Sequence, residues 1–190
     1  RFIFFAIFAI LKLETFSGSI KVKKILSFLG TLFIIVFVVY IYARYIEPNS
    51  LTVNYVNLNS SLISKEKGKL KILQFSDTHL SEYFDEEDLR KVVEKINEER
   101  PDLVVFTGDL IDEYNKYEEK EHIHDSWKVF NLIDAPLGKY AIYGNHDYGG
   151  GAEQVFKKIM EKSGFILLKN EKIRLEDYNI NIIGIDDSIF

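Results

Sequence analysis

Three short apolar runs, each followed by acids, histidine or asparagine, constrain the fold of this chain more than any other feature. The runs are 71–76, 103–107 and 140–143, and the motifs after them are Asp77-Thr78-His79, Gly108-Asp109-Leu110-Ile111-Asp112 and Gly144-Asn145-His146-Asp147. Runs of this length and composition predict β-strands. In an open α/β sheet, ligands bind outside the carboxyl ends of the strands. The pattern therefore predicts an α/β fold with oxygen and imidazole groups gathered at one edge, as in a metal site.

Helical patterns separate these predicted strands. Apolar residues recur at helical spacing between 89 and 96, Asp85 is a suitable N-cap, and Pro101 marks the exit. The unit from 70 to 106 is thus predicted as strand–helix–strand with a right-handed parallel crossover. Further helices are predicted at 126–133 and 152–162, with a flexible glycine turn at 149–151 before the second. The closing strands are 165–168, 173–175 and 180–185, and the last two form a hairpin.

The amino-terminal part predicts a membrane anchor at residues 1–46. No charged residue occurs from Ile25 to Ala43, and about 20 apolar residues cross the hydrocarbon core of a bilayer. We place the span at about 25–46. The alternatives are a buried helix of a globular protein and a cleaved signal peptide, against which the length of the apolar core and the lack of a small-x-small cleavage site count. Three lysines between 21 and 24 precede the span and only Arg44 follows it. The positive-inside rule therefore puts everything after Glu47 outside the cytoplasm.

Residues 47–68 are predicted to form a linker, and residues 69–190 the main domain. Leu51, Val53 and Tyr55 alternate with polar residues, which suggests a strand inside the linker. Net charge is −5 for the whole chain, but residues 1–46 hold six basic residues and one acidic residue, so the remainder carries −10. Such an acidic domain matches a polyphosphate backbone poorly, so no nucleic acid partner is expected. The chain has no cysteine, which excludes disulfides and thiolate metal sites.

The residue types at the strand ends indicate which ions the site would take. Carboxylate, carboxamide and imidazole ligands suit Mn, Fe or Zn and do not select between them. Asp77 and His79 are two residues apart, so they would face the same way and hold one ion together if the strand continued that far. Two ions about 3.5–4 Å apart can activate a hydroxide and clamp a phosphoryl group. Such a pair needs a shared carboxylate, and Asp109 is the natural candidate.

The order Asp-x-His, Gly-Asp-x-x-Asp and Gly-Asn-His-Asp resembles the calcineurin-like metallophosphoesterase superfamily. The preceding span and the segment 75–80 resemble its membrane-anchored bacterial branch. The resemblance implies part of a four-layer α/β/β/α sandwich, preceded by a transmembrane helix. It also implies two divalent metal ions: Asp77 and His79 would hold the first, Asp109 would bridge both, and Asn145 would bind the second.

The same resemblance implies catalytic roles in the second and third motifs. His146 would stabilise the transferring phosphoryl group or protonate the leaving oxygen, and Asp112 would orient it. Asp147 would have a supporting role at most. His122 and His124 match no motif of the superfamily, and we expect them in a solvated acidic segment.

The sequence departs from the superfamily pattern after the third motif. The pattern ends with one later histidine and two more in a Gly-His-x-His motif, but no histidine follows His146. We therefore expect a domain truncated at its carboxyl end, inactive as a fragment, within a full-length protein that is a phosphoesterase.

The predicted function is metal-dependent hydrolysis of phosphoester or pyrophosphate bonds by an enzyme tethered to the cell membrane, with its catalytic domain outside the cytoplasm. The expected substrate is a phosphorylated small molecule or a lipid-linked envelope component. Two alternatives stay open. One is a non-catalytic, membrane-anchored binding domain with a vestigial metal site. The other is a nuclease of the same superfamily, against which the acidic charge counts.

Overall fold

The computed structural model of the protein describes residues 20–47, 50–63, 68–117 and 121–186. It divides into two compact units, Arg1–Val53 and Asn54–Phe190. The first contains helix α2 (Ile20–Ile41), which continues into the π-helical turn η1 (Tyr42–Ile46). Among the described residues this is the one helix that could cross a membrane by length and composition, and none of its most apolar stretch is buried inside the protein. At about 1.5 Å per residue, its 27 residues extend about 40 Å.

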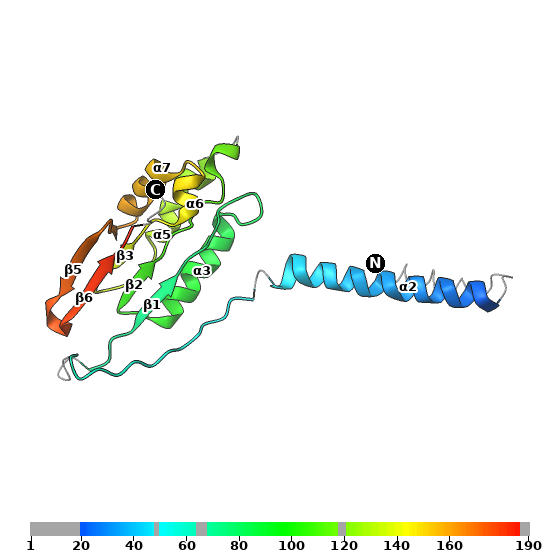
Figure 1. The fold of residues 1–190 in the computed structure, drawn as a ribbon, viewed down its shortest axis with the longest axis horizontal. Coiled ribbons are helices and arrows are strands. Elements are labelled where there is room, and N and C mark those ends of the chain that lie inside the picture. The colour runs from blue at the N-terminus through cyan, green and yellow to red at the C-terminus, as the bar shows by residue number, and fades with distance from the viewer. Residues whose placement is uncertain (1–19, 48–49, 64–67, 118–120, 187–190) are drawn as a thin grey trace. The chain divides into compact units, whose positions relative to one another are not determined.

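The second unit is built on a parallel sheet of four strands. These are β1 (Ile72–Phe75), β2 (Leu103–Phe106), β3 (Lys139–Ala141) and β4 (Phe165–Leu167), in the order β1-β2-β3-β4 (Figure 1). Phe75 is level with Phe106, and Phe106 is level with Ala141. The first three strands therefore finish at the same edge, as the three apolar runs predicted, and the motifs all leave from there.

Helices cover one face of this sheet. They are α3 (Glu86–Glu99), α4 (Glu121–Asp125), α5 (Trp127–Phe130), α6 (Asn145–Gly149) and α7 (Glu153–Lys162). The carboxylate of Asp85 caps α3 by accepting the N–H groups of Glu87 and Asp88, as predicted. The helix predicted at 126–133 is shorter. At its start, Ser126 turns back on α4, because its N–H and its hydroxyl both donate to the Ile123 carbonyl. At its end, the N–H groups of Leu132 and Ile133 donate three residues back, to Val129 and Phe130, so α5 ends at Phe130 and a turn follows.

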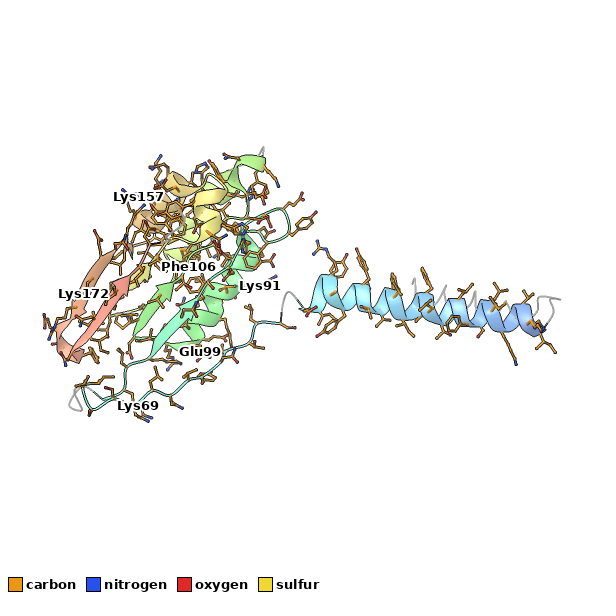
Figure 2. The ribbon with its side chains drawn as sticks, in the orientation of Figure 1. Lys69, Lys91, Glu99, Phe106, Lys157 and Lys172 are labelled. Atoms are coloured by element: carbon orange, nitrogen blue, oxygen red, sulfur yellow. The ribbon has the colours of Figure 1, made fainter. Side chains whose placement is uncertain are left out.

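Alternate residues of the strands enter two different cores. Phe106 faces the helices, where its ring centroid lies 4.8 Å from that of Phe75, 5.7 Å from Phe130 and 6.1 Å from Phe156. Figure 2 labels Phe106 inside the domain, whereas Lys157 and Lys172 extend outward. Leu103 belongs to the second core, on the opposite face. Burial on both faces explains why these strands are uniformly apolar in sequence.

A hairpin covers the second face of the sheet. Strands β5 (Glu171–Leu175) and β6 (Ile180–Gly184) pair antiparallel, joined through η5 (Glu176–Tyr178) and the left-handed residue Asn179, so the predicted hairpin is confirmed. The hairpin packs on the second core through Ile173 and Ile182. The described domain therefore has three layers: helices, the parallel sheet and the hairpin (Figure 1). These layers are part of the predicted α/β/β/α sandwich.

The strand suggested at 51–55 does not form, because the described segment 50–63 pairs with no strand. Alternation alone cannot make a strand without a neighbouring ladder. The segment is attached through other contacts: the Tyr55 hydroxyl donates to Glu99 at 2.8 Å, and the Leu62 carbonyl accepts from Asn179 at 3.0 Å. Glu99 also accepts from the ammonium of Lys71 at 2.7 Å, and these two donors lower the pKa of its carboxyl group.

Candidate metal centre

Asp77 and His79 converge, although not by the strand alternation expected from the sequence. Strand β1 ends at Phe75, and both residues have left-handed backbones, with φ of 55° and 43°. Hydrogen bonds from their N–H groups to the carbonyls of Gly108 and Asp109, each 3.1 Å, hold this conformation. Nε2 of His79 then lies 3.7 Å from the Asp77 carboxylate. Such backbones cost about 1–3 kcal/mol each and cluster at functional sites.

Asp109 is also left-handed, with φ of 57°, and two glycines bring it against the third motif. A Cβ on Gly108 would lie 2.1 Å from the backbone nitrogen of Gly144, and a Cβ on Gly144 would lie 2.2 Å from Oδ1 of Asp109. The His146 N–H donates to that same carboxylate oxygen at 2.8 Å. Gly108 in the second motif and Gly144 in the third are therefore required for the two loops to pack against each other.

These contacts assemble a group of possible metal ligands. Asp77, His79 and Asp109 each offer one ligand atom, and the three atoms lie within 4.8 Å of one another. Two carboxylates and an imidazole fit Mn, Fe or Zn. Asn145, the fourth predicted ligand, is the exposed first residue of α6 and lies between Gly144 and His146, both of which approach Asp109. The structure thus brings three predicted ligands together, and the fourth lies between two chain neighbours that both approach Asp109.

His146 and Asp112 also meet, but the shorter contact is with the backbone of Asp112. Nδ1 of His146 lies 3.0 Å from the Asp112 carbonyl oxygen and 3.4 Å from its carboxylate. A carbonyl only accepts, so Nδ1 carries the proton and Nε2 stays available. The hydrogen bond to this carbonyl, with the charges of Asp109 and Asp112, raises the pKa of His146.

His79 belongs to the metal-ligand group and also contacts His146. Its ring stands edge-on to that of His146, with centroids 4.7 Å apart. Its Nδ1 is 3.7 Å from the Asp112 carboxylate, too long for a hydrogen bond. Among the described residues this nitrogen is buried without a hydrogen-bond partner. His79, Asp112 and His146 form a second group with ligand atoms within 4.8 Å of one another, which sequence reasoning did not predict.

Asp147 is fully buried beneath the two loops and supports them. Its carboxylate accepts the backbone N–H groups of Asp109 at 2.9 Å, Leu110 at 3.1 Å and Gly144 at 2.9 Å. Burial raises the pKa of Asp147 to about 6, although these three hydrogen bonds act in the opposite direction. Both of its oxygens are occupied by the backbone, so its place in the structure is that of a support.

Tyr148 of α6 forms a polar cluster with Lys169 and Asp186 that the sequence analysis did not predict. The Tyr148 hydroxyl donates to Asp186 at 2.7 Å and accepts from Lys169 at 2.9 Å, and Lys169 is 3.2 Å from Asp186. The Asp186 side chain is only 10% exposed. Tyr148 lies two residues after His146, but no motif spacing points to the other two.

The remaining two histidines belong to neither ligand group. Nε2 of His124 lies 3.0 Å from the Tyr114 hydroxyl, and the described residues place neither His122 nor His124 in a candidate metal group.

Sequence comparisons with known proteins identify the family of this domain. Residues 70–186 match the family model of the calcineurin-like phosphoesterases. The chain is 43% identical over 151 residues to the uncharacterized metallophosphoesterase YkuE of Bacillus subtilis, covering 78% of this chain and 52% of that protein. It is 37% identical over 109 residues to the UDP-2,3-diacylglucosamine pyrophosphatase LpxG of Chlamydia trachomatis, covering 57% and 32%. It is 32% identical over 132 residues to the probable glycerophosphodiester phosphodiesterase GpdQ of Arcobacter nitrofigilis, covering 62% and 44%. The chain spans about half the length of the first relative.

Proposed function

The chain belongs to the calcineurin-like phosphoesterase family, and from that premise we propose that the full-length protein hydrolyses phosphoester or pyrophosphate bonds with two divalent metal ions. The observation that carries the proposal is the convergence of Asp77, His79 and Asp109 next to His146. Three separate strand ends supply these side chains, and their ligand chemistry suits divalent cations.

In this proposal, Asp77 and His79 hold one ion, Asp109 is shared, and Asn145 contributes to the second. When bound, the ions supply a hydroxide nucleophile and stabilise charge on the phosphoryl oxygens. Mn, Fe and Zn all suit the donor set. The hydrogen bond from His146 to Asp109 fixes the carboxylate that both ions would share.

His146 is the proposed proton donor. Its Nδ1–H is held by the Asp112 carbonyl, so Nε2 is the atom that faces the substrate. In the doubly protonated imidazolium form, which the raised pKa of His146 favours, Nε2–H can donate to a phosphoryl oxygen or to the leaving oxygen. Asp112 acts as a positioning residue through its backbone. Its carboxylate lies 3.7 Å from Nδ1 of His79, so in this proposal it would orient that ring only by moving closer when the ions bind. Metal-binding imidazoles commonly donate their second N–H to such a carboxylate.

We also propose a membrane tether formed by the helix Ile20–Ile46, with the phosphoesterase domain outside the cytoplasm. Lysines 21, 23 and 24 at the start of this helix, against Arg44 alone at its end, support the orientation. A tethered enzyme favours an envelope or lipid-linked substrate. The names of the relatives LpxG and GpdQ support a pyrophosphate or a phosphodiester bond as the target.

The deciding experiment uses full-length protein in detergent with Mn²⁺. Hydrolysis of p-nitrophenyl phosphate or bis(p-nitrophenyl) phosphate is expected. His146→Ala should lower kcat by about 10²–10⁴-fold, the range typical of a proton-transferring residue. Calorimetric Mn²⁺ binding should persist in that variant. The matched control is His124→Ala, which removes an exposed histidine bonded to Tyr114 and should change nothing.

Two results would replace this function. Mn²⁺ binding without hydrolysis of either ester, together with no effect of His146→Ala, would leave a metal-binding domain without catalysis. Faster cleavage of single-stranded DNA than of either ester would indicate a nuclease.

A further inference from the structure

Gly150 lies where the end of α6 meets the segment that follows the second motif. Its N–H donates to the His146 carbonyl at 2.8 Å, and its own carbonyl accepts the N–H of Asn115 at 3.2 Å. The glycine run 149–151, expected from the sequence to be a flexible turn, is therefore packed against the loop that contains Asp112.

The space beside Gly150 is filled by backbone atoms. A Cβ at this position would lie 2.8 Å from the carbonyl oxygen of His146, 3.0 Å from the carbonyl oxygen of Asp112 and 3.2 Å from Cα of Glu113. Backbone atoms cannot swing away as the end of a flexible side chain can. Any side chain at position 150 must therefore displace the Asp112–Glu113 backbone or the end of α6.

Conformation does not explain the glycine at position 150. Its φ is −78° and its ψ is −4°, values that other residues also adopt. Gly151 is the opposite case, because its φ is +77° and the three atoms nearest to an added Cβ all belong to the side chain of Asn115. At position 150 the requirement is for space, and at position 151 it is mainly for a left-handed backbone.

The crowded atom is the one that orients the imidazole. The Asp112 carbonyl oxygen accepts the hydrogen bond from Nδ1 of His146 at 3.0 Å. An added Cβ on Gly150 would lie 3.0 Å from that oxygen, whereas an ordinary contact is at least 3.4 Å. The oxygen would therefore have to move by about 0.4 Å. The clash between the new Cβ and the His146 carbonyl oxygen also displaces the end of α6. Separating these two backbones lengthens the bond on which the imidazole orientation depends.

We propose that Gly150 is a positioning residue for His146. By lacking a Cβ it admits the Asp112 carbonyl to Nδ1, which fixes the ring tautomer with the proton on Nδ1 and leaves Nε2 for the substrate. The catalytic consequence rests on the proposed function, whereas the tautomer is a property of the protein that can be measured without any substrate.

The direct test records histidine side-chain ¹⁵N spectra of the full-length protein in detergent, loaded with diamagnetic Zn²⁺. The His146 signals are identified by their loss in His146→Gln. At a pH where the His146 imidazole is neutral, the wild type should show the proton on Nδ1, and Gly150→Ala should shift His146 towards a mixture of tautomers. Gly149→Ala is the matched control, because Gly149 is exposed in the same helix one residue earlier, and its spectrum should match the wild type.

Two spectroscopic results overturn the inference. One is a His146 spectrum in Gly150→Ala that equals the wild type. The other is a wild-type spectrum with the proton on Nε2, which decides the question even if Gly150→Ala does not fold. Gly151→Ala adds a further check, since it strains the backbone without crowding Asp112. It should lower the melting temperature while keeping the wild-type tautomer.

A kinetic test separates this inference from the proposed function. Methyl p-nitrophenyl phosphate has a good leaving group and methyl phenyl phosphate a poor one, so only the second depends strongly on a well-placed proton donor. Gly150→Ala should lower kcat for the phenyl ester about tenfold more than for the nitrophenyl ester, with KM within about twofold. Displacements below 1 Å can have effects of this size.

The outcomes are distinguishable. A wild type that hydrolyses neither ester but shows the tautomer contrast refutes the proposed function and keeps the positioning role. Hydrolysis of both esters, with equal losses in Gly150→Ala and Gly149→Ala, refutes the positioning role and keeps the function.

Discussion

The buried carboxylate of Asp147 accepts the backbone N–H of Asp109 at 2.9 Å, so an acid with both oxygens occupied by backbone holds in place the acid that we expect to bind two ions. The same carboxylate reaches Gly144 in its own loop. The Asp147 side chain therefore joins the second and third motifs by hydrogen bonds, while Gly108 and Gly144 allow the backbones of the two motifs to come into contact.

Replacing Asp147 by asparagine should destabilise the domain. The carboxamide offers one acceptor oxygen and presents N–H groups to donors, so at least one buried N–H loses its partner. The expected loss in unfolding free energy is about 1–3 kcal/mol. Thermal unfolding of full-length protein measures it, with Asp134→Asn on an exposed loop as the control. Equal melting temperatures for the two variants would mean that Asp147 does not join the loops.

Gly108→Ala should be far more damaging than Gly68→Ala, although both glycines have positive φ. Gly68, at φ +75°, has nothing within 4 Å of an added Cβ, so its substitution costs about 1–2 kcal/mol of backbone strain. Gly108, at φ +88°, adds a 2.1 Å clash with the backbone of Gly144. Because both substitutions place alanine at a positive φ, the difference in melting temperature between Gly108→Ala and Gly68→Ala reports the contact between Gly108 and Gly144. A difference near zero would contradict the close approach.

Removing Asp109 should affect metal binding more than removing Asp77. If Asp109 is shared by two ions, Asp109→Ala weakens both binding events, whereas Asp77→Ala weakens only one. Isothermal titration with Mn²⁺ on the full-length protein distinguishes these cases by stoichiometry, and Asp134→Asn again serves as the control. Loss of a single equivalent in Asp109→Ala would argue against a bridging carboxylate.

The orientation of the tether can be tested independently of catalysis. Alkaline phosphatase inserted after Ser61, in the exposed segment that follows the helix, should be active because we place this segment outside the cytoplasm. The same insertion with lysines 21, 23 and 24 changed to glutamine should lose part of that activity. An inactive reporter in the first fusion, with normal protein levels, would reverse the orientation.

Most of the framework was predictable because it depends on local signals. The apolar runs predicted β1, β2 and β3, and the cap at Asp85 predicted the start of α3. Parallel strands finish at one edge by topology, so the meeting of Asp77 and Asp109 followed from the order of elements. The suggested strand at 51–55 failed for the complementary reason, since pairing depends on a neighbour that the local pattern does not reveal.

The detail of the site was not predictable because distant contacts set it. The left-handed backbones of Asp77 and His79 are held by carbonyls of the second motif, 30 residues or so along the chain. Likewise, Gly150 looked like part of a loose turn until its neighbours at 112 and 113 were in place. In both cases the residue types were visible in the sequence, but the atoms that constrain them come from another segment.

The neighbour order of the parallel sheet has a consequence for how the protein is made. Strands β1 to β4 lie side by side in the order in which the ribosome delivers them. The pairings β1–β2 and β2–β3, which gather the ends of the three motif-bearing strands, therefore involve only residues up to Ala141. No later residue is needed for the strand pairings that bring Asp77, Asp109 and Asn145 to one edge of the sheet.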